Sequence, residues 1–174
     1  VLRAFASFGF CKAHAAAFAL PTYQSAWLKT HYPAAFLAGV LTHDPGMYPK
    51  RLIVDEARQM GIAIAPLDVN ASDSVYRVED HGNAIRIALS TVAGISDGEV
   101  QSIIAARPYI DLNDFVRRSG SSTPVTESMI LTGAFDALHA DVNRRDLLLH
   151  FSHLQKSPSA AVSGAQMNLG FDPP

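Results

Sequence analysis

A Gly-containing turn that leads into a capped helix occurs twice in the second half of this chain, and this tandem pattern constrains the fold more than any other feature. In the first copy, Gly94 precedes Ser96, and Glu99 follows Ser96 by three residues, which is the spacing of a capping box. The apolar residues that follow recur at helical spacing, so we expect a helix over about residues 97–107. Such a helix start points several backbone N–H groups in one direction.

The second copy of the pattern is degenerate. A short helix is expected over residues 112–118, and a turn around Gly120 follows it. Thr123 is expected to cap the next helix, with Pro124 at its first position and Gly133 ending it. Two such units in tandem predict a compact helical domain.

The rest of the chain is expected to be largely helical. Pro21 should end or kink the first helix, and Gly61 stands where a left-handed C-terminal cap would fall. Further helices are expected over residues 22–31, 34–41, 50–60 and 141–155.

Between the two helical parts, the apolar pattern changes. Residues 62–66 are expected to be extended, and two alternating runs flank Asp80-His81-Gly82-Asn83, which predicts a β-hairpin. The predicted fold class is therefore mainly α with a small β-hairpin.

Composition places the chain among globular proteins. Its 174 residues are 48% hydrophobic and 17% charged, which is enough to bury a core. No apolar run reaches the roughly 20 residues of a membrane span. The single cysteine, Cys11, excludes an internal disulfide and favours a reducing, cytoplasmic setting. Because the chain starts at Val1 without an initiator Met, we expect an excised fragment.

Charge is unevenly distributed along the chain. The net charge is −2, but residues 1–60 carry +3 and residues 61–139 carry −5. A basic first third beside an acidic middle indicates at least two functional units.

The backbone N–H groups of the two turns can bind phosphate, so the tandem pattern favours a helix-hairpin-helix element that grips duplex DNA without sequence preference. The candidate backbone-binding residues are Gly94, Ser96, Gly98, Arg107, Arg117 and Arg118. Against this, Asp97 and Glu99 compete with a phosphate for the helix dipole. The alternative is a non-catalytic helical scaffold that binds protein and not DNA.

A metal hydrolase is a third hypothesis, and it is disfavoured. His139, His150 and His153 lie near one another in the sequence, but no carboxylate–histidine spacing supports a metal site. Cys11 beside Lys12 is more typical of a buried, inert thiol than of an activated one.

Several strings resemble the α-subunit family of bacterial C-family DNA polymerases (DNA polymerase III α). The strings are residues 8–19 (FGFCKAHAAAFA), 23–33, 66–70 (PLDVN), the Gly94 turn and 132–136 (TGAFD). Residues 42–51 (THDPGMYPKR) resemble the error-prone branch of that family. The resemblance covers roughly residues 3–155. The sequence departs from the family where Ser96 and Ala88 stand at positions that are often Gly.

The resemblance implies a division of the chain into three parts. Residues 1–64 would be the C-terminal part of the polymerase fingers, and residues 65–155 a tandem helix-hairpin-helix domain that binds the duplex behind the active site. Residues 156–174 are rich in Ser, Ala, Gly and Pro, and this composition predicts a flexible tail. The parent protein would be a DNA-directed DNA polymerase, a nucleotidyltransferase of the error-prone, DNA-repair type. Its palm carboxylates, with their Mg²⁺ ions, lie upstream in the family, so this fragment should be inactive and bind no cofactor.

The resemblance also suggests two further sets of site residues. Lys12, His14, Lys50 and Arg51 of the fingers are candidates to approach the nucleotide or the primer-template. The alternative is that Lys12, Lys50 and Arg51 are solvated and that His14 packs against Phe18. In the tail, a sliding-clamp-binding motif is suggested at Gln166, Met167, Leu169 and Phe171. The expected partners are duplex DNA, the β sliding clamp and the rest of the polymerase chain, with no membrane.

Overall fold

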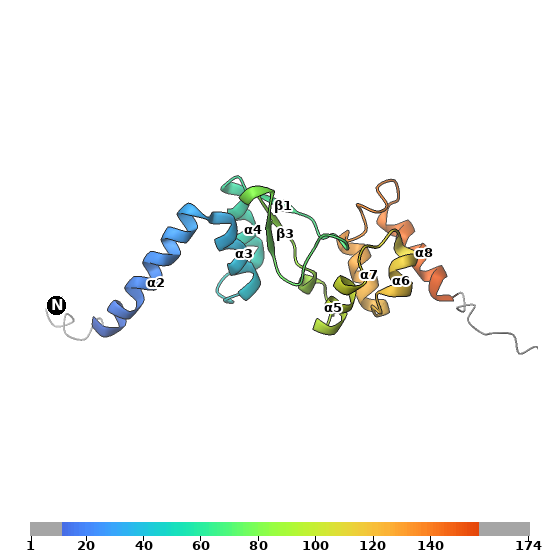
Figure 1. Cartoon of the computed structure of the whole chain (residues 1–174), viewed down its shortest axis with the longest axis horizontal. Helices are drawn as coiled ribbons and strands as arrows, with labels where there is room; N and C mark the ends of the chain where they lie inside the picture. The colour runs from blue at the N-terminus through green and yellow to red at the C-terminus, as the bar shows by residue number, and fades with distance from the viewer. Residues whose placement is uncertain (1–11, 157–174) are drawn as a thin grey trace, which may run out of the picture.

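The computed structural model describes residues 12–156, which form a mainly helical chain with one small sheet (Figure 1). The order of elements is α2 (Lys12–His31), α3 (Pro33–His43), α4 (Lys50–Gln59), β1 (Ala63–Ala65), β2 (Arg77–Glu79), a 3₁₀ turn (Asp80–Gly82), β3 (Ala84–Arg86), a second 3₁₀ turn (Leu89–Thr91), α5 (Asp97–Ala105), α6 (Leu112–Arg118), α7 (Thr123–Thr132) and α8 (Arg144–Lys156). The predicted fold class is confirmed. No helix in the described part is long and apolar enough to cross a membrane.

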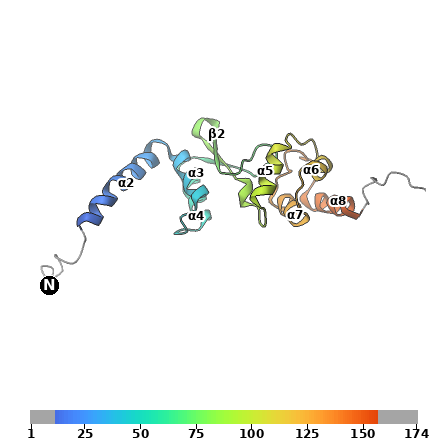
Figure 2. The same ribbon diagram turned by 60° about the horizontal axis from the view of Figure 1, so that its bottom comes forward.

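Helix α2 corrects the expectation that Pro21 ends the first helix, because one helix runs from Lys12 to His31 through that proline. Pro21 cannot donate to the carbonyl of Ala17, but Ala17 is exposed, so water can satisfy that carbonyl. The helix buries none of its residues. Figures 1 and 2 show it projecting away from the other elements, and a Lys29–Glu56 ion pair joins its C-terminal part to α4.

Helices α3 and α4 begin and end close to their predicted bounds. Pro33 occupies the first turn of α3, where its missing N–H has no partner to lose. Gly61 follows α4 at φ +79°, the left-handed conformation that the sequence predicts for a C-terminal cap.

The sheet contains the predicted β-hairpin and one pairing that the sequence pattern missed. Strands β2 and β3 are antiparallel, with Val78 opposite Ile85, and the 3₁₀ turn at Asp80–Gly82 joins them. Strand β1 pairs parallel with β3, so the strand order is β1-β3-β2. Such a long-range parallel pairing leaves no local turn signal, which explains why the sequence indicated only the hairpin.

Two separate hydrophobic cores lie along the chain. The first joins α3, α4 and the sheet and consists of Ala34, Leu37, Ala38, Leu41, Ile53, Ala57, Ile62 and Ile85. The second joins α5 to α8 and is centred on Tyr109, Phe115 and Phe135, whose rings meet edge to face at centroid distances of 5.0 Å. In Figures 1 and 2 the four helices of the second core lie beyond the sheet from α3 and α4.

The segment between β1 and β2 is tied to the second core by polar contacts. Asn70 exchanges two hydrogen bonds with the backbone of Tyr109, each 2.8 Å long. The backbone N–H of Val69 donates to the carbonyl of Ala134 at 2.8 Å. These contacts hold the loop around residues 67–73 against the helices that carry the tandem turns.

Helices α5 to α8 follow the predicted order, and α6 matches its predicted bounds. Gly133 ends α7 at φ +87°, as expected. The prediction for the start of α7 is wrong by one residue, because Ser122 and not Thr123 is the N-cap. Pro124 then stands at the second helical position, where an N–H is also unnecessary.

Candidate nucleic-acid interface

The first turn leaves its backbone open to solvent. Gly94 adopts φ +80°, which only glycine enters without strain, and a side chain there would meet nothing within 4 Å. The predicted capping box is present: the Glu99 N–H donates to the Ser96 hydroxyl at 3.3 Å, and the Glu99 carboxylate accepts from the Ser96 N–H at 3.0 Å. Gly98 lies in the first turn of α5.

Phosphate binding would need free backbone amides at the Gly94 turn and at the start of α5. Among the described residues, the N–H groups of Gly94, Asp97 and Gly98 have no hydrogen-bond acceptor. They lie at the positive end of the α5 dipole. These amides are therefore free to donate to a ligand at the backbone.

The second turn lies beside the first, and one carboxylate joins them. Glu99 Oε1 accepts from the Ser122 N–H at 3.0 Å and from the Ser122 hydroxyl at 2.7 Å. Its other oxygen, Oε2, serves Ser96. Gly120 of the second turn has φ +67° and, like Gly94, open space around it. The structure thus brings the two predicted turns together at the N-terminal ends of α5 and α7.

The Glu99 carboxylate is strongly stabilised in its charged form. Hydrogen bonds from the backbone N–H groups of Ser122 and Ser96, and then from their hydroxyls, lower the pKa of Glu99 to about 2. The group therefore carries its negative charge at neutral pH, between the N-terminal ends of α5 and α7.

Arg107 is turned toward the protein. Its guanidinium donates to the carbonyl of Val69 at 2.7 Å and to the carbonyl of Ser72, and burial lowers the pKa of this half-buried group. The side chain holds the loop around residues 67–73, and only part of its donor capacity remains for a ligand.

Arg117 and Arg118 lie at the end of α6, directly before the second turn, and both face Asp114. Arg118 binds the Asp114 carboxylate at 3.1 Å and the Pro108 carbonyl at 3.1 Å, and its guanidinium lies 5.1 Å from the centre of the Tyr109 ring. Arg117 is 75% exposed and makes only a loose 3.8 Å contact with Asp114. Arg117 is therefore the more available cation of the two.

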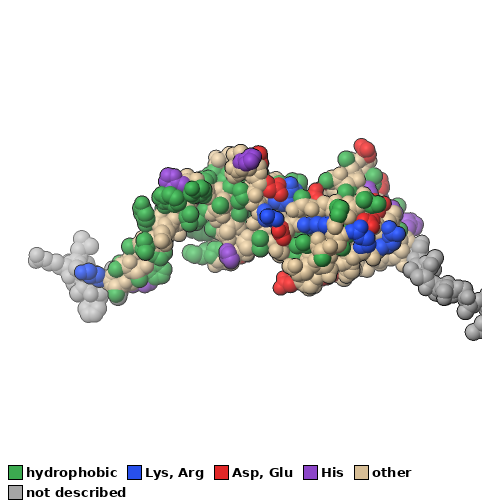
Figure 3. All heavy atoms as spheres, viewed as in Figure 1, with side chains coloured by type: hydrophobic (Ala, Val, Ile, Leu, Met, Phe, Trp, Pro, Cys, Tyr) green, Lys and Arg blue, Asp and Glu red, His purple; other side chains and the backbone are tan. Residues whose placement is uncertain are grey.

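Three further arginines, two on the sheet and one at the start of α8, are held in ion pairs. Arg77 pairs with Asp73, Arg86 with Glu79 and Arg144 with Asp136. The hydrogen bonds between Arg86 and Glu79 raise the pKa of the arginine and lower that of the carboxylate. Figure 3 shows one face of the molecule, and most of its Lys and Arg side chains lie on the half toward the C-terminal helices. Carboxylates offset the charge of Arg77, Arg86, Arg118 and Arg144, whereas Arg107 and Arg145 have no ion pair with a described residue.

The four residues assigned to the fingers lie in two places. Lys12 and His14 stand in the first turn of α2, where His14 and Phe18 have ring centres 4.5 Å apart. Lys50 begins α4 and pairs with Asp44 at 3.4 Å, whereas Arg51 is exposed. Figure 1 shows the beginning of α2 far from α4, so the structure does not bring the two pairs together.

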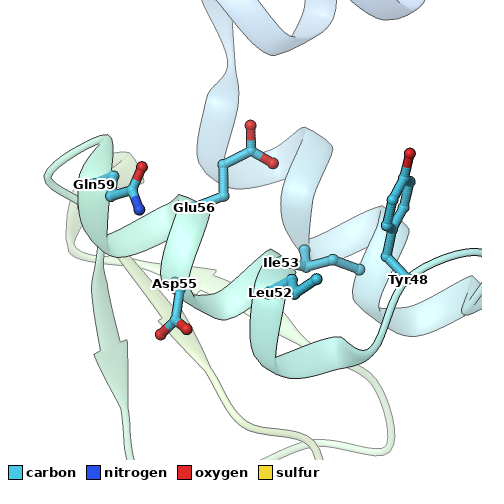
Figure 4. A pocket seen from close by; sticks show the side chains of 6 residues that line it. All are labelled: Tyr48, Leu52, Ile53, Asp55, Glu56 and Gln59. Atoms are coloured by element: carbon cyan, nitrogen blue, oxygen red, sulfur yellow. The ribbon is translucent and has the colours of Figure 1, made fainter.

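An open pocket of about 460 Å³ lies beside α4 and is lined by Tyr48, Leu52, Ile53, Asp55, Glu56 and Gln59 (Figure 4). Its two carboxylates point to different sides of the helix, and each is bound by a cation: Asp55 by Arg58 and Glu56 by Lys29. They do not form the facing pair that general acid–base chemistry uses.

Within residues 12–156, no group of three or more His, Cys, Asp or Glu side chains is placed to hold a metal ion. His139 Nε2 accepts a hydrogen bond from the Leu112 N–H at 3.1 Å, which gives that ring a structural role. The suggested clamp motif at Gln166, Met167, Leu169 and Phe171 lies outside the described residues, as does Cys11.

Sequence reasoning missed two residues of this region. Ser122 is the true N-cap of α7 and the second partner of Glu99, and only the spatial approach of the two turns reveals it. Arg145 at the start of α8 is exposed and has no ion pair with any described residue. The charge pattern alone could not distinguish it from its ion-paired neighbour Arg144.

The tandem turns belong to a known class of domain. Residues 61–147 match the family model described as the helix-hairpin-helix motif. That range covers β1 through the beginning of α8, and it includes both Gly turns and the Glu99 bridge.

Full-length relatives extend the match to most of the chain. The error-prone DNA polymerase of Symbiobacterium thermophilum is 37% identical, over 88% of this chain and 16% of the relative. That of Bdellovibrio bacteriovorus is 36% identical, over 98% of this chain and 17% of the relative. DNA polymerase III subunit alpha of Vibrio cholerae is 39% identical, over 79% of this chain and 12% of the relative. The chain therefore belongs to the family of bacterial DNA polymerase III α subunits and error-prone DNA polymerases, and it spans about a sixth or less of these relatives' length.

Proposed function

We propose that the helices around the second core bind the sugar–phosphate backbone of duplex DNA without sequence preference. The observation that carries this proposal is the adjacency of two helix N-termini whose turns contain open glycines at positive φ. Unpartnered first-turn amides at Gly94, Asp97 and Gly98 can donate to phosphate oxygens, which carry no base information.

The isolated chain should bind DNA weakly. Asp97 and Glu99 stand in the first turn of α5, and two arginines of this region, Arg118 and Arg144, are paired with carboxylates. A weak grip suits a module that acts as one part of a larger DNA-binding protein, where other segments contribute further phosphate contacts.

We further propose that the protein containing this chain is a DNA-directed DNA polymerase of the error-prone, repair-associated branch. The names of the two error-prone relatives support the branch, and residues 42–51 resemble it. Within that protein, residues 1–64 would be the end of the fingers, with Lys12, His14, Lys50 and Arg51 approaching the nucleotide or primer-template. The catalytic carboxylates would lie elsewhere in the longer protein, so the fragment would be inactive by itself.

A sliding clamp is a second proposed partner. Leu169 and Phe171 would each contribute about 1.5–3 kcal/mol on burial in an apolar pocket, and Gln166 would supply a directed hydrogen bond. Calorimetric titration of a bacterial sliding clamp should detect binding by the full chain and none by the Leu169→Ala/Phe171→Ala variant. Equal heats for both chains would refute this assignment.

The test of the DNA proposal is a salt titration of duplex binding followed by fluorescence anisotropy. A duplex module that neutralises Z phosphates should give a log–log slope of about −0.9Z. The Arg117→Ala variant should weaken binding of every duplex sequence equally and reduce the slope by about 0.9.

Arg58→Ala is the matched control for this titration. Arg58 is 61% exposed and pairs with an aspartate three residues before it, as Arg117 does, but it lies on α4 away from both turns. Its loss should leave the slope unchanged. If the wild type fails to bind duplex even at low salt, the alternative of a protein-binding scaffold is correct. A change of sequence preference in Arg117→Ala would contradict backbone binding.

A further inference from the structure

The bond pattern around Glu99 differs from that of an ordinary capping box. In a capping box the carboxylate returns to the backbone of its own N-cap and stops there. Here Oε2 completes the box at Ser96, while Oε1 binds both the N–H and the hydroxyl of Ser122, at 3.0 and 2.7 Å. Ser122 lies 23 residues further along the chain and is the N-cap of the other hairpin's helix.

This carboxylate is the polar link between the two turns. No other hydrogen bond among the described residues joins residues 94–99 to residues 119–123. Below the turns, both helices bury apolar residues in the second core, including Val100 and Val125. The core holds the buried faces of the two helices together, whereas Glu99 joins their exposed N-terminal ends.

The bridge also changes how α7 begins. The Ser122 hydroxyl donates to Glu99, and no side chain caps the first turn of α7. A serine N-cap ordinarily accepts a hydrogen bond from its own helix. The orientation of Ser122 is therefore set by the neighbouring hairpin and not by α7.

We infer that Glu99 is a positioning residue that holds the two turns at the spacing needed to bind one DNA backbone at two places. The inference rests on the proposed duplex function and assigns a favourable role to a residue whose charge should repel DNA. Each oxygen of the carboxylate serves one helix end, so both oxygens must be acceptors. A glutamine keeps the size of the side chain but places an NH₂ group against one of the two sets of donors.

The test compares Glu99→Gln with Asp97→Asn in the duplex salt titration. Both variants remove one negative charge from the first turn of α5, but Asp97 takes no part in the bridge. If Glu99 acts only through its charge, both variants should bind duplex more tightly. If it positions the turns, Asp97→Asn should bind duplex at least about twofold more tightly than wild type at 0.1 M salt. Glu99→Gln should bind duplex about eightfold more weakly than wild type under the same conditions. That loss corresponds to one phosphate contact and to a slope reduced by about 0.9.

A second measurement separates this inference from the proposed function. Hydrogen exchange in the DNA-free protein should show the Ser96 amide or the Ser122 amide, whichever faces the new NH₂ group, exchanging at least fivefold faster in Glu99→Gln than in wild type, with the amides of buried α7 residues unchanged. Wild-type exchange rates at both amides in the variant, or tighter duplex binding by it, would overturn the positioning role. If the wild type binds no duplex at any salt, the proposed function fails and the inference fails with it. Binding by the wild type with a tighter Glu99→Gln overturns the inference alone.

Discussion

The two hydrophobic cores differ in what surrounds them. The second core has sixteen buried residues with three aromatic rings packed edge to face at its centre, and polar contacts from Asn70 and Arg107 tie the preceding loop to it. The first core has eight buried residues, three of them alanine, and large apolar side chains around it remain exposed, including Met47, Tyr48 and Leu52. Large apolar side chains are exposed beside the second core too, including Ile110, Leu131 and Leu149, so the two cores differ mainly in size and in the polar contacts that support them.

This difference indicates which core contributes more to the free energy of folding. Burial of apolar area is the main favourable contribution to folding, and the larger second core supplies most of it. The helix-hairpin-helix unit can therefore present its exposed turns rigidly. The helices before the sheet depend on a smaller core with open edges, so they should open more readily.

Substitutions to alanine in each core should have the largest effect. Phe115 is fully buried between Tyr109 and Phe135, and Phe115→Ala should lower the free energy of unfolding by about 3–5 kcal/mol. Leu41→Ala in the first core should lower it by about 2–3 kcal/mol, because small and partly open surroundings collapse more easily around the lost side chain.

Denaturant unfolding with hydrogen exchange measures both effects. Phe115→Ala should speed exchange throughout α5 to α8, while Leu41→Ala should speed it only in α3, α4 and the sheet. An equal loss of protection across all elements in both variants would mean that the two cores unfold as one unit, and the contrast between them would be wrong.

Two glycines, one in each half, should respond to alanine with opposite signs. Gly94 needs φ +80°, so Gly94→Ala should destabilise the protein by about 1–2 kcal/mol. Gly39 lies inside α3 with open space around it, so Gly39→Ala should stabilise by about 0.5–1 kcal/mol. Thermal unfolding measures both. A stabilising Gly94→Ala would show that the first turn does not require its left-handed residue.

The local features of this fold were predictable from the sequence, and the contacts between distant residues were not. Helix α6, the capping box at Ser96 and the cap at Gly133 follow from residues within one or two turns of one another. The β1–β3 pairing depends on an approach in space that no local pattern records. Homologous strings made the family recognisable because they preserve residue order, but they carry no information on which arginine is ion-paired.

The candidate site divides in the same way. Both turns and their glycines were predicted, because a positive φ favours glycine and a helix N-cap favours serine or threonine, and both preferences are visible in the sequence. The link between them was missed, because Glu99 already had a local partner in Ser96 and nothing in the sequence required a second one. Arg107 was assigned to DNA, yet its donors reach the carbonyls of Val69 and Ser72, a contact across more than thirty residues.

The smallest expected effect is the pH dependence of the Glu99 bridge. Its pKa is about 2 in the folded protein against an ordinary value of 4.5, so the folded state favours the charged form. The stabilisation is therefore fully present above about pH 4.5, falls as the pH drops toward 2, and disappears below it. Because the side chain is exposed and screened by water, it should amount to less than about 1 kcal/mol. The difference in melting temperature between wild type and Glu99→Gln should be constant from pH 7 to about 4.5 and then shrink toward zero, since the other carboxylates titrate alike in both chains. A difference that stays constant down to pH 2 would mean that the charged carboxylate does not hold the turns together.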